Sequence, residues 1–411
     1  MKDSIKQNPL WLDLCDDVPE RYPWLSEDET AAVCVIGGGI TGALCALELS
    51  RDGVDTVLLS ASPVGLCGSA YSSGAMQCEI PGGLSALCDG IGMDKAVRVY
   101  EECDKALDEI EALCGEFTDD CGFVRQDSLC FTTDDDKADD LRQEYLLRRR
   151  SGIPVELIDS LSLRDEFSFP IAGGILTRHR AARMDPYRFC HMAMQKAVEH
   201  GARVYENTSV EKVENDTGSY VLTTSTHRRV HCEKLVIAIG SDVADFIKNS
   251  GTRRTSFSVV TKPVSAFSGW EGGCILNSLD RPQMTLLKTP DNRIFASGLS
   301  TGLVSRQGRM AGILPLETLS ERKFEHMEQL LSSLFPSILE TSPEYGFATT
   351  SIECDDGLPK VGCHDEYENC YFASAGGENG ILFSKIAAGM IADMYRGERT
   401  PLMKVFSPMR K

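Results

Sequence analysis

The first strong hydrophobic pattern in the chain is a short apolar run that ends in glycines. Residues Ala32–Ile36 are all apolar and mostly β-branched, which is typical of a strand buried on both faces of a parallel sheet. Glycines dominate 37–42, the apolar positions of 43–49 fit a helix, and Thr56–Leu59 is a second buried run. The pattern therefore predicts a strand–turn–helix–strand unit.

The rest of the hydrophobic pattern indicates two kinds of sheet. A further buried strand is predicted at 234–240 after a hairpin at 209–223, and another at 371–373 precedes a long apolar helix at 382–394. Apolar residues recur at helical spacing in 94–114 and 317–334, and turns separate the predicted strands 256–267, 283–288 and 293–297. We therefore expect an α/β fold in which two domains are interleaved.

The first glycine turn matches G-x-G-x-x-G in the context that dinucleotide binding requires. Gly37 permits the tight turn, Gly39 lets the backbone approach a pyrophosphate, and Gly42 lets the helix pack closely on the strand. Ile40 and Thr41 lie in this turn and are predicted to contact the cofactor, and the free amides of the helix start bind phosphate charge. The turn predicts a bound dinucleotide.

The end of the second strand departs from the usual dinucleotide pattern. An acidic residue normally binds the ribose hydroxyls there, but this chain has Ser60, followed by Ala61. A hydroxyl makes a neutral hydrogen bond in place of charge-assisted ones worth roughly 1.5–3 kcal/mol. No arginine follows in 61–63, so a pocket for the 2′-phosphate of NADP is not indicated.

A second glycine-rich turn near the C-terminus favours flavin over nicotinamide. A helix N-terminus directed into the same crevice suits the ribityl chain or the electron-rich end of a flavin ring. A nicotinamide dehydrogenase has no evident need for this element. The residues predicted to bind the cofactor here, and at the end of the 234–240 strand, are Gly376, Gly377, Asn379, Gly380, Ile381, Ala238 and Gly240.

In this order the motifs resemble those of the D-amino acid oxidase/glycine oxidase (DAO) superfamily of FAD-dependent oxidoreductases. The resemblance runs from about Tyr22 to the C-terminus and rests on 35–42, 68–77, 185–187, 238–240, 289–293, 356–359 and 376–381. It implies that Val210 contacts the adenine side of FAD through its backbone. It also implies that a segment wraps the flavin through Gly68, Ser69, Ser72, Ser73, Ala75 and Met76.

The resemblance implies a Rossmann-like FAD-binding domain interleaved with an α+β substrate domain built on an antiparallel or mixed sheet. We expect an N-terminal arm at 1–29, an FAD-binding domain at 30–90, 174–252 and 347–405, and a substrate domain at 91–173 and 253–346. Trp11 and Trp24 suit an arm docked on the FAD-binding domain. Non-covalent FAD is expected, because Thr349 stands where some relatives link flavin to cysteine, and Cys354 lies too close to the next turn.

The substrate pocket departs from the relatives that bind a carboxylate. They usually carry an arginine where our alignment places Leu287. Lys288 follows it, but side chains alternate along a strand, so Lys288 should face the opposite way. Lys262 and Arg306 are the other possible carboxylate partners.

Gln77 and Glu79 directly follow the flavin-wrapping segment and are predicted to line the pocket. A carboxylate at this place would suit a cationic amine. Together with Lys288, these two residues are the predicted catalytic groups.

The predicted reaction is oxidation of a C–N bond in a small amine or amino acid. Hydride passes from the carbon next to nitrogen to the flavin, and water hydrolyses the imine. The electron acceptor is left open between oxygen, a quinone and a carrier protein. A flavin monooxygenase is disfavoured, because 373–380 contains no Gly-Asp turn. The alternative is a catalytically degenerate flavin-binding or regulatory homologue of the same fold, which Ser60 and Leu287 favour.

Composition sets the remaining bounds. The 411 residues suggest two domains, and 61 acidic against 42 basic residues give a net charge of −19, which disfavours nucleic acid or an anionic membrane as partner. No apolar run could span a bilayer and no signal peptide is evident, so we expect a cytoplasmic protein. The sixteen cysteines form no C-x-x-C pair, which predicts reduced thiols and no metal site.

Overall fold

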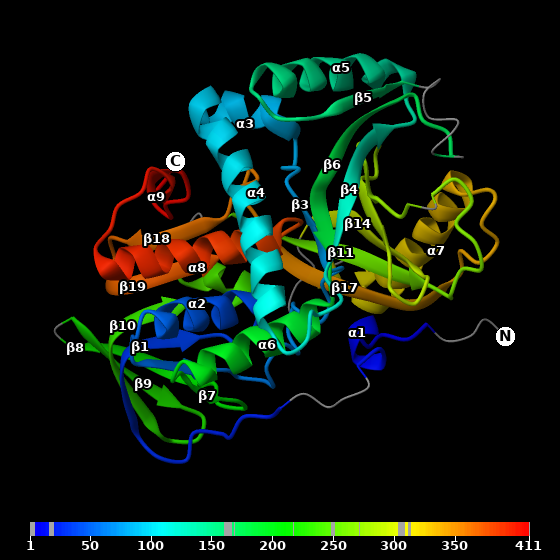
Figure 1. Ribbon diagram of the computed structural model, residues 1–411. Helices are drawn as coiled ribbons and strands as arrows, with labels where there is room; N and C mark the ends of the chain where they lie inside the picture. The colour runs from blue at the N-terminus through cyan, green and yellow to red at the C-terminus, as the bar shows by residue number, and fades with distance from the viewer. Residues whose placement is uncertain are drawn as a thin grey trace.

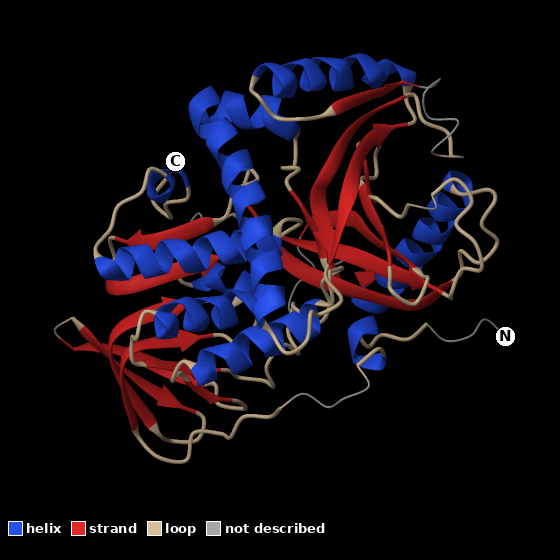
Figure 2. Ribbon diagram, in the orientation of Figure 1, coloured by secondary structure: helices blue, strands red, loops and turns tan. Residues whose placement is uncertain are grey.

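The computed structural model describes residues 5–15, 20–159, 167, 169–216, 218–247, 251–270, 272–302, 309–310 and 314–410. Two sheets with flanking helices make up this part of the chain, and Figures 1 and 2 show their arrangement. One sheet has a parallel centre and the other is mostly antiparallel, so the predicted fold class is confirmed.

The first sheet has the strand order β18-β19-β10-β1-β2-β7, and its edge strand β18 runs antiparallel to β19. The neighbours from β19 to β7 run parallel to one another. A hairpin of β8 and β9 continues the sheet from β10. The strands are β1 (Glu29–Ile36), β2 (Thr56–Leu59), β7 (Arg203–Tyr205), β8 (Val210–Asp216), β9 (Ser219–Thr224), β10 (Arg229–Ile237), β18 (Lys360–His364) and β19 (Tyr367–Ser374).

Helices cover one face of this sheet and share a single hydrophobic core with it. The helices are α2 (Ile40–Arg51), α4 (Met93–Glu116), α6 (Pro186–Glu199) and α8 (Gly380–Arg396). The start of α6 shows why the sequence folds this way: the Asp185 carboxylate accepts from the amides of Tyr187 and Arg188, and Pro186 occupies the first turn. The opposite face packs on β9 and on the segment after the short helix η2 (Gly240–Asp245).

The second sheet has the order β17-β11-β14-β13-β12-β4-β6-β3, with β5 paired to β6, and the pairing of β12 with β4 is parallel. The predicted strand 256–267 ends at Thr261, because Pro263 lacks the amide that a ladder needs. The strands are β3 (Ala75–Gln77), β4 (Val124–Thr132), β5 (Glu156–Asp159), β6 (Gly173–Arg183), β11 (Thr252–Thr261), β12 (Ile275–Ser278), β13 (Met284–Lys288), β14 (Ile294–Gly302) and β17 (Pro343–Glu353). A small separate pair joins β15 (Arg309–Met310) and β16 (Leu314–Pro315).

The two faces of the second sheet have different coverings. Helix α7 (Leu316–Leu334) packs on one face, while α3 (Gly83–Ile91) and α5 (Asp135–Arg150) lie at the upper end of the sheet in Figure 1. We call the other face, which carries Ala181, Ile275 and Leu287, the front face. Alternation along the strands places Asn277 there, and Gln77 joins it through its pairing with Ala181.

The N-terminal arm contacts the second sheet and helix α6 through its short helix α1 (Leu10–Asp13). Leu10 is fully buried in the front-face cluster, and Trp11 packs on Ala70 and donates its indole N–H to the Ser72 carbonyl at 2.8 Å. Trp24, in contrast, is 64% exposed.

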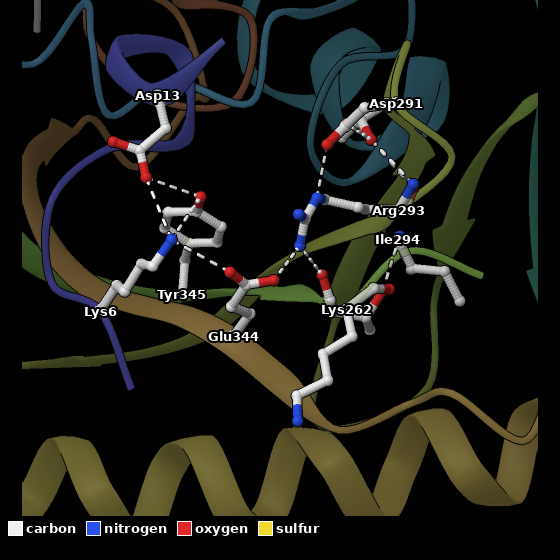
Figure 3. Close-up of polar contacts among 10 residues, drawn as sticks. Lys6, Asp13, Lys262, Asp291, Arg293, Ile294, Glu344 and Tyr345 are labelled. Carbon is white, nitrogen blue, oxygen red and sulfur yellow. Dashed lines mark hydrogen bonds and ion pairs between the residues drawn. The ribbon is translucent and has the colours of Figure 1, made fainter. Parts of the chain in front are cut away.

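A polar cluster fixes the beginning of the arm to β17 (Figure 3). The Lys6 backbone donates to the Glu344 carbonyl and accepts from the Gly346 amide, at 2.8 and 2.9 Å. The Lys6 ammonium lies 3.0 Å from the Glu344 carboxylate and 3.2 Å from that of Asp13. Arg293 extends the cluster, with ion-pair distances of 2.5 Å to both Asp291 and Glu344.

The predicted domain boundaries stay a prediction. The two sheets alternate along the chain more often than the predicted domain ranges do. Strands β3 and β6 belong to the second sheet, although much of their sequence falls in ranges expected for FAD binding. Helix α4 packs with α8 in the core of the first sheet, although its range was expected in the substrate domain. The C-terminal helix α9 (Leu402–Val405) joins the same core.

Two further properties concern the described residues as a group. None of their helices is long and apolar enough to cross a membrane. None of the sixteen cysteines forms a disulfide, and no group of three or more His, Cys, Asp or Glu among the described residues is arranged to hold a metal ion.

Because the arm is docked through Leu10, we expect the Leu10→Ala substitution to lower the free energy of unfolding substantially. Deleting a fully buried leucine removes its transfer free energy and leaves a cavity, so we expect the unfolding free energy to fall by about 2–5 kcal/mol in urea denaturation. The matched variant Leu339→Ala, at a side chain 87% exposed, should change it by less than about 0.5 kcal/mol. Equal stabilities of the two variants would contradict the docked arm.

Candidate functional site

The turn between β1 and α2 brings backbone segments unusually close together. Gly37 has φ +123°, and a Cβ atom there would lie 2.2 Å from the Ala238 carbonyl oxygen at the end of β10. A Cβ atom on Gly42 would lie 1.9 Å from the Gly37 oxygen. Both positions therefore require glycine, and the N-terminus of α2, capped by Gly39, lies directly over the strand ends.

The second glycine turn leads from β19 into α8 beside the first. Gly377 has φ +95°, and Asn379 is the N-terminal cap residue of α8. The Thr41 hydroxyl, at the start of α2, lies 2.8 Å from the Ser384 hydroxyl in the first turns of α8. The structure thus places the N-termini of two helices side by side, although 340 residues of sequence separate their first residues, Ile40 and Gly380.

The flavin-wrapping segment closes on the same place. The Ser69 hydroxyl, on a side chain 9% exposed, accepts from the Ile40 amide at 3.0 Å. Ser72 and Ser73 accept from the amides two residues ahead, while Gly68 is exposed. A phosphate oxygen at the first turn of α2 would accept hydrogen bonds from backbone amides in the same way as the Ser69 hydroxyl does.

Ser60 lies at the end of β2, as predicted, but its hydroxyl donates to the Ser62 carbonyl at 2.6 Å. The Ser60 carbonyl accepts from the Thr208 amide at 2.8 Å, which brings the start of β8, with Val210, near this end of the crevice. Ala61 is exposed.

A buried acid that the sequence analysis missed stabilises the loop beyond Ser60. The Glu206 carboxylate is 1% exposed and accepts from the amides of Val64 and Tyr22, at 2.6 and 3.3 Å. Its signal in the sequence was weak, because it follows the three-residue strand β7 without a recognisable motif.

These residues fit an FAD molecule. The amide oxygen of Asn379 is buried and has no hydrogen-bond partner among the described residues, while its amide nitrogen donates to the Glu79 carbonyl at 2.5 Å. Burying an acceptor without a partner costs about 1–3 kcal/mol, so this oxygen is a natural ligand for a donor of a bound flavin. Gly376, Gly380 and Ile381 complete the turn around it.

A cavity of about 650 Å³ opens between the front face, α3, α5 and the second glycine turn. Two amide side chains form its floor: Gln77 donates to Asn277 at 3.0 Å and Asn277 donates back at 2.7 Å. The Thr285 hydroxyl donates to the Asn277 carbonyl oxygen at 3.1 Å. Gln77 therefore lies where the sequence predicts it, in a hydrogen-bonded pair that fixes its orientation.

Glu79 also lines the cavity, but its carboxylate already forms an ion pair with Arg148. It accepts from the Arg148 guanidinium and from the Thr177 hydroxyl, the latter at 2.9 Å, and both Glu79 and Arg148 are buried. Burial alone would lower the pKa of Arg148, but Glu79 and Glu144 raise it well above its ordinary value. Glu144 in turn accepts from the Leu84 amide at 2.6 Å. The network connects β3, β6, α3 and α5 into one wall of the cavity.

The candidate carboxylate partners lie elsewhere. Leu287 is fully buried in the front-face cluster, while the Lys288 ammonium lies over the Phe267 ring on the opposite face, 4.3 Å from its centroid. The alternation predicted for these two side chains is thus present, and Lys288 is not directed at the cavity. Lys262 is exposed, and Figure 3 shows its side chain pointing away from Arg293. Arg306 lies outside the described residues.

Two charged residues near the site were missed by the sequence analysis. Glu378, within the second glycine turn, lines the cavity with an accessible side chain, while burial by the surrounding protein and then the nearby Glu353 raise its pKa. Arg183 pairs with Ala75 on the front face, where burial lowers its pKa and its Nε has no partner among the described residues. The carboxylate in a glycine-rich turn was a usable signal for Glu378, whereas Arg183 had none.

Known proteins share this architecture. Residues 32–394 match the model of the DAO family, described as FAD dependent oxidoreductase. The chain is 24% identical to a glycine oxidase of Bacillus licheniformis over 92% of this chain and 96% of that protein. It is 25% identical to the putative Rieske 2Fe-2S iron-sulfur protein YhfW of Bacillus subtilis, over 96% of this chain and 74% of that protein. The crystal structure of glycine oxidase from Geobacillus kaustophilus superposes with a TM-score of 0.75 at 20% identity, covering 93% and 99% of the two chains.

The close approach at the first turn predicts that Gly42→Ala abolishes FAD binding. The added methyl group would meet the Gly37 carbonyl at 1.9 Å, and relieving this overlap by shifting α2 costs about 1–3 kcal/mol or more. We expect the purified variant to contain less than about a tenth of the wild-type FAD, measured by its visible absorption. Gly115→Ala, in the exposed last turn of α4 with open space around it, should retain the cofactor. Normal FAD content in Gly42→Ala would refute the assignment.

Because His191 is buried, we expect the folding stability of the protein to depend on pH. Burial, and to a smaller extent the positive charge of Arg21, lowers the pKa of His191 from 6.5 to about 4. The unfolded chain therefore binds this proton at a higher pH than the folded chain, and stability falls as the pH drops from 6.5 towards 4, by up to roughly 3 kcal/mol. His191→Phe should remove this part of the slope in denaturation curves recorded across the window. Parallel pH profiles for wild type and variant would rule out the buried neutral imidazole.

Proposed function

This chain belongs to the DAO family of FAD-dependent oxidoreductases, and we propose that it oxidises a C–N bond of a small amine or amino acid. The cofactor is FAD, and the motif analysis supports non-covalent binding. We propose that the first sheet with its helices binds FAD and that the front face of the second sheet binds the substrate.

The cavity beside the second glycine turn is the observation that carries this proposal. It is bounded by the turn expected to meet the flavin and by uncharged hydrogen-bonding groups of the front face, Gln77, Asn277 and Thr285. A volume of about 650 Å³ accommodates a small organic molecule. Substrate in this space would lie between the front face and the cofactor.

Bound FAD supplies the acceptor for a hydride. The chain supplies position and a dry environment. The reciprocal Gln77–Asn277 pair presents fixed polar groups, and the apolar front-face residues Ile275 and Leu287 exclude water next to them. The substrate loses a hydride from the carbon next to nitrogen and a proton from the nitrogen, and water converts the resulting imine to a carbonyl compound and an amine or ammonia.

Oxidation of a C–N bond is tested with matched pairs of compounds. The FAD-loaded protein is mixed without oxygen with alanine or lactate, glycine or glycolate, and butylamine or butanol, while the visible flavin absorption is followed. We expect members with nitrogen to bleach the flavin and their oxygen analogues to leave it oxidised.

Two outcomes would overturn the proposal. Bleaching by the oxygen compounds alone would assign C–O oxidation. A protein that holds FAD but is reduced by no member of an amine library would support the catalytically degenerate alternative.

A further inference from the structure

We propose that Glu378 binds the positively charged amino group of the substrate and that the enzyme therefore prefers cationic amines to α-amino acids. This inference rests on the proposed function, which leaves amines and amino acids as equal candidates.

Glu378 is placed where cofactor and substrate would meet. It lies in the turn between β19 and α8, directly before Asn379, whose unpaired amide oxygen marks the expected flavin contact. The same residue lines the cavity together with Gln77 and Asn277 of the front face. A ligand in the cavity can therefore touch the Glu378 carboxylate and the amide pair at once.

The other carboxylates of the inner wall are already committed. Glu79 and Glu144 bind Arg148, and Glu144 also accepts from backbone amides. Glu378 and Asp140 of α5 are both exposed, and neither has a hydrogen bond or ion pair among the described residues. Of these two carboxylates, Glu378 is the one that lies in the turn expected to meet the flavin.

The surroundings of Glu378 favour a positive ligand. The side chain is accessible to a ligand, and nearby protein and then the negative charge of Glu353 raise the pKa of its carboxyl group. An ammonium group placed beside Glu378 would stabilise the carboxylate, because an opposite charge favours the charged form. An anion at the same place would be repelled.

Two of the three cations that line the cavity are engaged by carboxylates. Arg148 is held by Glu79 and Glu144, and the Lys137 ammonium lies 3.5 Å from the Asp280 carboxylate. The third, Arg150, is exposed at the C-terminal end of α5, and Arg183, which has no partner among the described residues, does not line the cavity. Within the second glycine turn itself, the charge that the wall offers is the negative charge of Glu378.

The preference for cations is tested with three compounds of one length on the FAD-loaded enzyme: 1,4-diaminobutane, butylamine and 4-aminobutyrate. We expect the wild type to give the highest kcat/KM for the diamine and the lowest for the amino acid. Glu378→Gln should lower kcat/KM for the diamine at least thirtyfold, mainly through KM, and Glu378→Asp should restore part of it. Glu366→Gln, at the far end of β19 in an exposed turn, is the matched control and should behave as wild type.

A binding measurement separates Glu378 from catalysis. Tetramethylammonium has no N–H bond, and its Kd is measured through the change it causes in the flavin spectrum or by calorimetry. We expect Glu378→Gln to raise this Kd about tenfold with FAD content and the ligand-free spectrum unchanged.

The failures of the two proposals can be told apart. If no amine reduces the flavin, the proposed function fails, while the tetramethylammonium Kd still tests Glu378. If 4-aminobutyrate or α-amino acids are the better substrates and Glu378→Gln leaves them unaffected, this inference fails and C–N oxidation stands. An unchanged Kd accompanied by an altered flavin spectrum would mean that Glu378 acts on the cofactor, which overturns the inference.

Discussion

The arrangement of the site depends on one close backbone approach, between the β1–α2 turn and the end of β10. Gly37 and Gly42 leave no side-chain atoms between α2 and the strand ends. Any Cβ there would push α2 outwards, and Thr41 would no longer reach Ser384 of α8. Since amides at a helix N-terminus attract negative charge, two such termini at one crevice would suit the phosphates of the proposed FAD site.

The cavity next to this crevice owes its shape to charges that neutralise one another. Arg148 and Glu144 lie on α5 and Glu79 follows β3, and removing Arg148 would leave buried negative charge without a partner, at a cost of several kcal/mol. The paired network therefore has a structural explanation that requires no ligand. Glu378 differs, because no cation in the described chain pairs with its carboxylate. Groups with a shifted pKa are common at functional sites.

The fold and the cofactor turns were predictable from the sequence because their causes are local. The buried strand Ala32–Ile36 and the glycines after it are read from neighbouring residues, and Asp185-Pro186 predicts a helix start in the same way. The pocket was less predictable, because its contacts join distant segments. The sequence around Glu79 does not predict that Arg148 will form an ion pair with it. Arg183 comes to lie on the front face only because β3 and β6 pair, which the sequence does not predict either. Lys288 was the intermediate case, since strand alternation predicted its direction but not the Phe267 ring beneath it.

The docked arm has a consequence for the order in which the chain assembles. Lys6 is translated more than three hundred residues before its partners Glu344 and Tyr345. Contacts of such long sequence separation form late, because they require the intervening chain to be in place. Until β17 is made, Leu10 has no complete surface on which to dock, and the hydrophobic front face lacks its cover. The arm is thus translated long before β17 but reaches its native place only afterwards, and the nascent chain must remain soluble with both partners of this contact still exposed.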